Sequence, residues 1–274
     1  MKELKFKEAE EKTVKLFDSV EQELSSIKKK EVTLLTKEYT DKLSDLLAKV
    51  KLEIAFVGQY SAGKSTIISA ISGIKNIKIG QDITTDEPKA YPWGNVFLID
   101  TPGIYAGRPE HDKASIEYMN KADLLIYVIT TQGFSSKTAE NFKKIAFIEN
   151  RIDKIMLVIN KSSQGNKETS KTNWIADALT VAEPKTSDDL FLSVMDAKDC
   201  LDASEIEDNS DKEALIDYSD FNYFVDNLNQ FIKKKGVLGR LITPLNLTQD
   251  YLNRVINSLT SSNEDTENML DLLS

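Results

Sequence analysis

The sequence has very few of the residues that form disulfides or bind transition metals. Its 274 residues include one cysteine, Cys200, and one histidine, His111. A single cysteine excludes an intrachain disulfide and a cluster of metal-bound thiolates, and a single histidine excludes a zinc site built from several histidines. The sequence therefore points away from disulfide-stabilised and zinc-dependent proteins.

Long apolar runs are also missing. No segment approaches the roughly eighteen consecutive apolar residues of a transmembrane helix, and the N-terminus lacks the apolar region of a signal peptide. The formal net charge of −9 disfavours binding to nucleic acids, because their phosphate backbones bind to positively charged surfaces. We therefore expect a cytoplasmic protein with no nucleic-acid partner, and any membrane association would come through a surface element or a region outside this chain.

Glycine and proline are absent from both ends of the chain. Residues 1–57 contain neither, and none occurs after Pro244. Apolar side chains recur there at spacings of three and four residues, which predicts a long amphipathic N-terminal helix and a C-terminal one. The N-terminal stripe comprises Phe17, Val20, Leu24, Ile27, Leu35, Tyr39, Leu43, Leu46 and Val50, and the C-terminal stripe comprises Leu252, Val255, Ile256 and Leu259.

An isolated helix can bury neither stripe and would be unstable in water. We therefore expect the two ends to pack together as a helical bundle; the alternative is two independent helices lying on the core of the central domain. A further stripe at Met269, Leu270 and Leu273 runs almost to the last residue. It favours a fragment of a longer protein over a short natural C-terminus, and it indicates a tendency to self-associate.

The middle of the chain alternates between two patterns. Strand-like apolar runs lie at 52–57, 96–99, 123–130, 154–159 and 190–194, and Pro88 and Pro92 would restrict a strand near 88–93 to a sheet edge. Helical stretches lie near 64–74, 113–121, 136–149 and 172–182, and another is expected from Phe221 to Lys235, ending at Gly236. This alternation predicts an α/β domain whose mainly parallel sheet is covered by helices on both faces. We expect an N-terminal helical segment at 1–50, the α/β domain at 51–240 and a C-terminal helix at 241–274.

A complete phosphate-binding loop follows the first predicted strand. The string from Gly58 to Ser65 matches G-x-x-x-x-G-K-S and stands between a strand and a helix, as the motif requires. Its backbone N–H groups can form an anion nest at the positive end of the helix dipole. Lys64 can reach the β- and γ-phosphate oxygens, and the Ser65 hydroxyl can bind Mg²⁺. The expected nucleotide contacts are Gly58, Gln59, Tyr60, Ser61, Ala62, Gly63, Lys64, Ser65 and Thr66.

A second nucleotide signature follows the strand at 96–99. In Asp100-Thr101-Pro102-Gly103, the carboxylate can hold a Mg²⁺-bound water and the Gly103 N–H can contact the γ-phosphate. Between the two motifs, a threonine is expected to complete the Mg²⁺ coordination. Thr85 is the first choice and Thr84 the alternative. The predicted metal ligands are therefore Ser65, Thr85 and Asp100.

These motifs together resemble the P-loop GTPases of the translation-factor-like branch. The fuller string from Val57 to Thr66, with an aromatic residue before Ser-Ala-Gly-Lys-Ser, is similar to the bacterial dynamin-like proteins, and among these to the ones linked to enterotoxin secretion. The motif-bearing resemblance covers about residues 51–200. The helical ends fit the neck bundle of that family by their pattern alone.

The resemblance implies a GTPase whose catalytic residues are Ser61, Lys64 and Thr85. Ser61 would help to position the attacking water and a charge-compensating cation. Tyr60 stands where eukaryotic dynamins have a glutamine that orients water, and Ile104 follows Gly103 where small GTPases have theirs. Hydrolysis would then depend on the phosphate loop, Thr85 and a partner in a dimer.

The segments that would read the base depart from the usual pattern. Asn160 and Lys161 begin an Asn-Lys-x-Asp motif, but Ser163 replaces its aspartate. A hydroxyl cannot accept both hydrogen bonds that guanine offers, so selectivity against ATP could fall about tenfold, and Ser163→Asp is expected to raise it. Ala197 and Lys198 occupy the positions of a second base-binding loop, which begins here with Asp196.

The leading hypothesis is a dynamin-like GTPase that binds GTP with Mg²⁺ and hydrolyses it to GDP. Nucleotide state would drive domain pairing and movement of a helical neck, in membrane remodelling or vesicle-associated secretion. The alternatives are a nucleotide-gated or weakly hydrolysing interaction module with relaxed base specificity, and an ATP-using P-loop protein.

Overall fold

The computed structural model describes residues 2–48, 51–74, 77, 88–103, 116, 118–164 and 167–272. The chain divides into two compact units. The sheet unit is Lys51–Gly239, and the helical unit combines Met1–Val50 with Arg240–Ser274. Each is described separately below.

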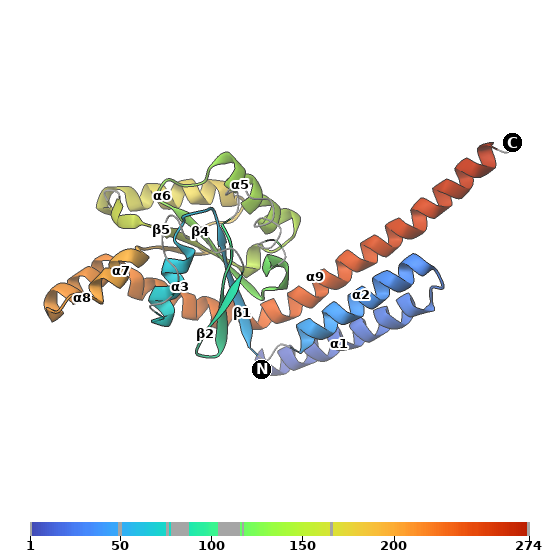
Figure 1. The fold of residues 1–274 in the computed structure, drawn as a ribbon, viewed down its shortest axis with the longest axis horizontal. Coiled ribbons are helices and arrows are strands. Elements are labelled where there is room, and N and C mark those ends of the chain that lie inside the picture. Colours follow the sequence, from blue (N-terminus) through green and yellow to red (C-terminus); the bar gives the residue numbers. More distant parts are fainter. Residues whose placement is uncertain are drawn as a thin grey trace. The chain divides into compact units, whose positions relative to one another are not determined.

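The sheet unit is built on six strands in the order β2-β3-β1-β4-β5-β6 (Figure 1). Their bounds are Leu52–Gly58 for β1, Lys89–Trp93 for β2, Val96–Asp100 for β3, Leu124–Thr130 for β4, Ile155–Asn160 for β5 and Phe191–Val194 for β6. β2 is antiparallel to β3 at the edge, and the remaining pairs are parallel. The strands predicted from apolar runs are confirmed, and the proline-containing one lies at the edge, where a missing N–H is tolerated.

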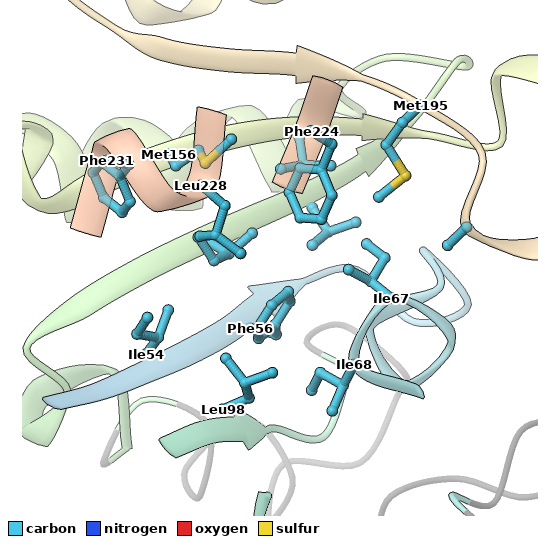
Figure 2. Close-up of a cluster of buried hydrophobic side chains, with 14 of the residues drawn as sticks. Ile54, Phe56, Ile67, Ile68, Leu98, Met156, Met195, Phe224, Leu228 and Phe231 are labelled. Carbon is cyan, nitrogen blue, oxygen red and sulfur yellow. The ribbon is translucent and has the colours of Figure 1, made fainter. Parts of the chain in front are cut away.

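Helices bury both faces of the sheet. On one face, α3 (Lys64–Ser72) contributes Ile67 and Ile68, and the first part of α9 (Phe221–Leu272) contributes Phe224, Leu228 and Phe231. Figure 2 shows these side chains converging on β1, β3 and β5. The other face is covered by α5 (Ser136–Lys143), the π-helical turn Lys144–Ile148 and α6 (Lys167–Ala182). The predicted fold class, a mainly parallel sheet covered on both faces, is therefore confirmed.

Shorter helices complete the unit around β5 and β6. Single 3₁₀ turns lie at Ile152–Lys154 and Ser162–Gln164, and α7 (Ala197–Ala203) and α8 (Asn209–Tyr218) follow β6. Of the helix predicted near 113–121, the structure describes 118–121 as helical, and most of the rest lies outside the described residues.

The predicted helix end at Gly236 is wrong. α9 continues through Gly236 and Pro244 to Leu272. Gly236 is buried, and a Cβ there would lie 2.8 Å from Cδ1 of Leu52. The glycine therefore permits close packing against the start of β1 rather than ending the helix.

The helical unit contains two N-terminal helices instead of the single long one predicted. α1 spans Lys2–Ser26 and α2 spans Lys30–Leu47, with three non-helical residues between them. Dividing the stripe in this way lets both helices face one core, which a single straight helix could not build. That core includes residues from α1, α2 and the last part of α9: Phe17, Leu24, Val32, Tyr39, Leu43, Tyr251 and Val255.

Hydrogen bonds fix the direction in which α2 and α9 pair. The Tyr39 hydroxyl lies 3.1 Å from Oγ1 of Thr248, and Nζ of Lys29 donates to the Ser258 carbonyl at 2.6 Å. Residue numbers rise along α2 as they fall along α9, so the two helices are antiparallel. The predicted pairing of the two ends is confirmed. Within the described part of the chain, no helix is both long and apolar enough to cross a membrane.

Tyr251→Ala should destabilise the helical unit by about 3 kcal/mol, because a large ring is removed from its core. The ring is buried, lies 5.7 Å from the ring of Tyr39, and its hydroxyl accepts from Nζ of Lys42 at 3.1 Å. Hydrogen exchange of α1 and α2 measures the loss. Ile256→Ala on the same helix is the control, because this side chain is 54% exposed, and its cost should stay within about 0.5 kcal/mol. Equal protection of α1 and α2 in both variants would contradict the bundle.

Candidate nucleotide-binding site

Two glycines define the loop between β1 and α3. Gly58 ends β1 with φ of 139°, and a Cβ there would lie 2.1 Å from the carbonyl oxygen of Val128. Gly63 precedes α3 with φ of 93°, and its Cβ would lie 2.2 Å from Nδ2 of Asn160. Both positions combine a positive φ with no room for a side chain, so the local structure requires glycine.

Lys64 is the first residue of α3 and its side chain is only 7% exposed. Its Nζ donates to the carbonyls of Gly58 at 3.3 Å and Gln59 at 3.2 Å. Burial lowers the pKa of Lys64 from 10.5 to about 8, and the nearby Asp100 carboxylate partly opposes the shift. A buried cation with only weak partners is suited to an anionic ligand at this loop.

The candidate metal ligands Ser65 and Asp100 meet at the carboxyl ends of β1 and β3. The Ser65 hydroxyl donates to Oδ2 of Asp100 at 2.6 Å. The neighbouring Thr101 hydroxyl donates to the Phe56 carbonyl at 2.6 Å and anchors the end of β3 to β1. A hydroxyl and a carboxylate oxygen beside a phosphate loop fit the oxygen ligands that Mg²⁺ prefers.

Three further residues predicted to lie near the phosphates belong to the described part of the chain, and three others do not. Gly103 lies against the loop, since a Cβ there would come within 2.5 Å of Cα of Tyr60. Tyr60 itself is 38% exposed, and Ser61 has φ of 61°, which is uncommon for a residue other than glycine. Thr84, Thr85 and Ile104 lie outside the described residues.

Asn160 connects the phosphate loop with the second predicted base-binding segment. Its Nδ2 donates to the Ala62 carbonyl at 2.9 Å, and its Oδ1 accepts from the Ala197 N–H at 3.1 Å. The side chain is almost completely buried at the end of β5. Asn160 thus brings together three segments that are far apart in the sequence, which explains why an amide is needed here: it donates on one side and accepts on the other.

Ser163 contacts two aspartates that belong to the next segment. Its backbone N–H donates to Oδ2 of Asp196 at 3.2 Å, and its hydroxyl donates to Oδ2 of Asp199. Asp196 also caps the N-terminus of α7, where its Oδ1 accepts from the N–H groups of Lys198 at 2.9 Å and of Asp199 at 3.3 Å. The ammonium of Lys198 pairs with Asp202 on the same helix.

Sequence reasoning missed Asp199. In the sequence, an aspartate three residues after Asp196 is typical of the first turn of a helix. Nothing in that local pattern indicates a contact with Ser163, which lies on a different loop. Burial raises the pKa of Asp199, the Ser163 hydrogen bond opposes that rise, and the charge of Asp196 adds to it.

Comparisons with known proteins agree with this geometry. The family model for 50S ribosome-binding GTPases matches residues 53–161. GTPase Der of Lawsonia intracellularis is 30% identical over 128 residues, which cover 42% of this chain and 28% of that protein. GTPase Obg of Protochlamydia amoebophila is 26% identical over 102 residues, covering 34% of this chain and 30% of that protein. The sheet unit has the fold of a P-loop GTPase domain.

Solved structures extend the similarity to almost the whole chain. The LeoA bacterial dynamin GTPase from ETEC superposes with a TM-score of 0.51 at 18% identity, covering 95% of this chain and 48% of that one. A structure described as an oligomerised bacterial dynamin pair gives 0.54 at 13% identity, with coverages of 97% and 58%. The chain therefore has a bacterial dynamin-like fold, and it spans about half the length of those proteins.

Proposed function

We propose that this chain binds GTP with Mg²⁺ and hydrolyses it to GDP and phosphate by in-line attack of water. The observation that carries the proposal is the arrangement at the carboxyl ends of β1 and β3. There the glycine-bounded loop is followed by the buried Lys64 and by Ser65, and the Ser65 hydroxyl is hydrogen-bonded to Asp100. A buried cation, an anion nest and a pair of oxygen ligands are the groups that a magnesium-bound triphosphate requires.

Each residue has a separate role in the proposed reaction. Lys64 would stabilise charge on the transferring phosphoryl group, while Ser65 and Asp100 would hold the metal ion, Asp100 through a water. Thr85 would complete the coordination, and Ser61 would position the attacking water. Bound Mg²⁺ would neutralise charge on the β- and γ-phosphate oxygens.

The proposed biological role couples nucleotide state to pairing of sheet units and to movement of the helical unit. Its support is the fold shared with bacterial dynamins, one of which is described as an oligomerised pair that provides a mechanism for the long-range sensing and tethering of membranes. We expect this chain to self-associate through its GTPase face or its helical unit. We expect this coupling to act in membrane remodelling or vesicle-associated secretion, with membrane contact through a surface element or a region outside this chain.

The second candidate function is a nucleotide-gated helical module that hydrolyses weakly and reads the base loosely. Two observations favour it. Tyr60 stands in the phosphate loop where a glutamine would orient the attacking water, and Ser163 replaces an aspartate in the base-reading motif. Such a module would bind GDP but release little phosphate from GTP.

Calorimetric titration of the purified chain with GDP and ADP, each with Mg²⁺, tests the proposal. We expect GDP to bind more tightly than ADP by about tenfold or more, and binding of both to weaken when EDTA removes the metal. Tighter binding of ADP than of GDP would contradict the GTPase proposal and indicate an ATP-using protein. Absence of heat with either nucleotide would contradict the proposed site.

A further inference from the structure

The base-reading region contains a carboxylate that the sequence motif does not predict. Ser163 occupies the motif position of the missing aspartate, and its hydroxyl donates to Oδ2 of Asp199. The Asp199 carboxylate therefore lies within hydrogen-bond distance of the side chain that would face the base. Asn160 holds this region beside the phosphate loop, through its bonds to Ala62 and Ala197.

Asp196 and Asp199 differ in how their oxygens are used. Both oxygens of Asp196 accept backbone N–H groups, from Lys198 and Asp199 on one side and from Ser163 on the other. Asp199 accepts the Ser163 hydroxyl with Oδ2, and among the described residues no donor contacts its Oδ1. Asp196 is thus committed to organising the start of α7, while Asp199 retains Oδ1 and the second lone pair of Oδ2 as acceptors for a ligand.

We infer that Asp199, oriented by Ser163, is the carboxylate that reads guanine in this protein. The inference rests on the proposed function. Guanine presents the N1–H and the 2-amino group side by side on its Watson–Crick edge, and a carboxylate accepts both, whereas adenine presents an acceptor at N1 and no 2-amino group. The serine acts as a positioning residue, and the acceptor comes from α7 rather than from the loop after β5.

This arrangement reverses the expectation for Ser163→Asp. The new carboxylate would replace a donor and would face the carboxylates of Asp196 and Asp199. Like charges at hydrogen-bond distance repel, and the new side chain has no proton to donate at neutral pH. The substitution should therefore lower the preference for GDP over ADP instead of raising it.

The test is Asp199→Asn in the full chain, titrated with GDP, ADP and xanthosine diphosphate in the presence of Mg²⁺. An amide can still accept the N1–H but donates where the carboxylate accepted, which matches the carbonyl at C2 of xanthine. We expect GDP affinity to fall by about tenfold or more, ADP affinity to stay unchanged, and xanthosine diphosphate to bind better than it does to the wild type. A purely structural role for Asp199 cannot produce this gain.

Matched variants separate the possible failures. Glu205→Gln removes an exposed carboxylate just after α7 that has no contact with Ser163, so its three affinities should equal those of the wild type. Ser163→Ala keeps Asp199 but removes its anchor, and it should lower GDP affinity without creating xanthosine diphosphate binding. Unchanged ratios in Asp199→Asn, or an equal loss of all three nucleotides, would overturn the inference while leaving the GTPase proposal intact. A wild-type chain that binds none of the three would overturn the proposed function itself.

Discussion

Lys64→Ala is expected to abolish triphosphate binding, with a loss of affinity of at least about 100-fold. The ammonium is the buried cation of the loop, and charge-assisted contacts to two phosphate oxygens contribute roughly 1.5–3 kcal/mol each. Within the protein, Nζ makes hydrogen bonds of 3.2 and 3.3 Å to the carbonyls of Gln59 and Gly58. Titration with a non-hydrolysable GTP analogue and Mg²⁺ measures the loss.

Two further variants control this result. Lys137→Ala removes an exposed lysine from α5, and it should bind the analogue as the wild type does. Lys64→Met keeps most of the buried side-chain volume without the charge, so it should fold normally and still fail to bind. If either Lys64 variant binds as tightly as the wild type, the phosphate loop is not the nucleotide site.

Gly58→Ala should destabilise the sheet unit by about 3 kcal/mol or more. The residue has φ of 139°, and a Cβ would lie 2.1 Å from the Val128 carbonyl oxygen, a backbone atom of the adjacent β4. Relief of that clash requires separation of β1 and β4, so backbone strain and overpacking add together. The midpoint and slope of urea unfolding give the change in the free energy of unfolding.

Gly73→Ala is the matched control. It also replaces a glycine of positive φ, 70°, but a Cβ there would meet no atom within 4 Å. Its cost should be about 1–2 kcal/mol, the conformational term alone. Equal losses for the two variants would show that the close approach of β1 to β4 at Gly58 contributes nothing.

The strands of the sheet could be predicted from the sequence because local patterns mark them, whereas their order in the sheet comes from the structure. β4 and β5 are buried along their entire lengths and appear in the sequence as continuous apolar runs. The helices at the ends were harder to delimit. The sequence from Ser26 to Lys30 contains no glycine or proline, so nothing marked the break between α1 and α2. Conversely, Gly236 looked like a helix end, although tertiary packing against Leu52 explains the glycine.

Some residues of the candidate site could also be predicted from the sequence, and others could not. Lys64, Ser65 and Asp100 belong to short contiguous motifs, so their residue types and spacing predict that they lie close together. The hydrogen bond between Ser65 and Asp100 is consistent with that prediction. Asp199 could not be found in this manner, because its contact with Ser163 depends on how the start of α7 lies beside the turn that follows β5. The role of Thr85 stays a prediction, since it lies outside the described residues.

Phosphate release from GTP by the purified chain with Mg²⁺, measured over a range of chain concentrations, shows whether this chain is a GTPase. We expect release that Lys64→Ala abolishes and that is faster with GTP than with ATP. Its rate per chain should rise with concentration as sheet units pair. Release from GTP no faster than that of Lys64→Ala at every concentration would contradict the GTPase proposal.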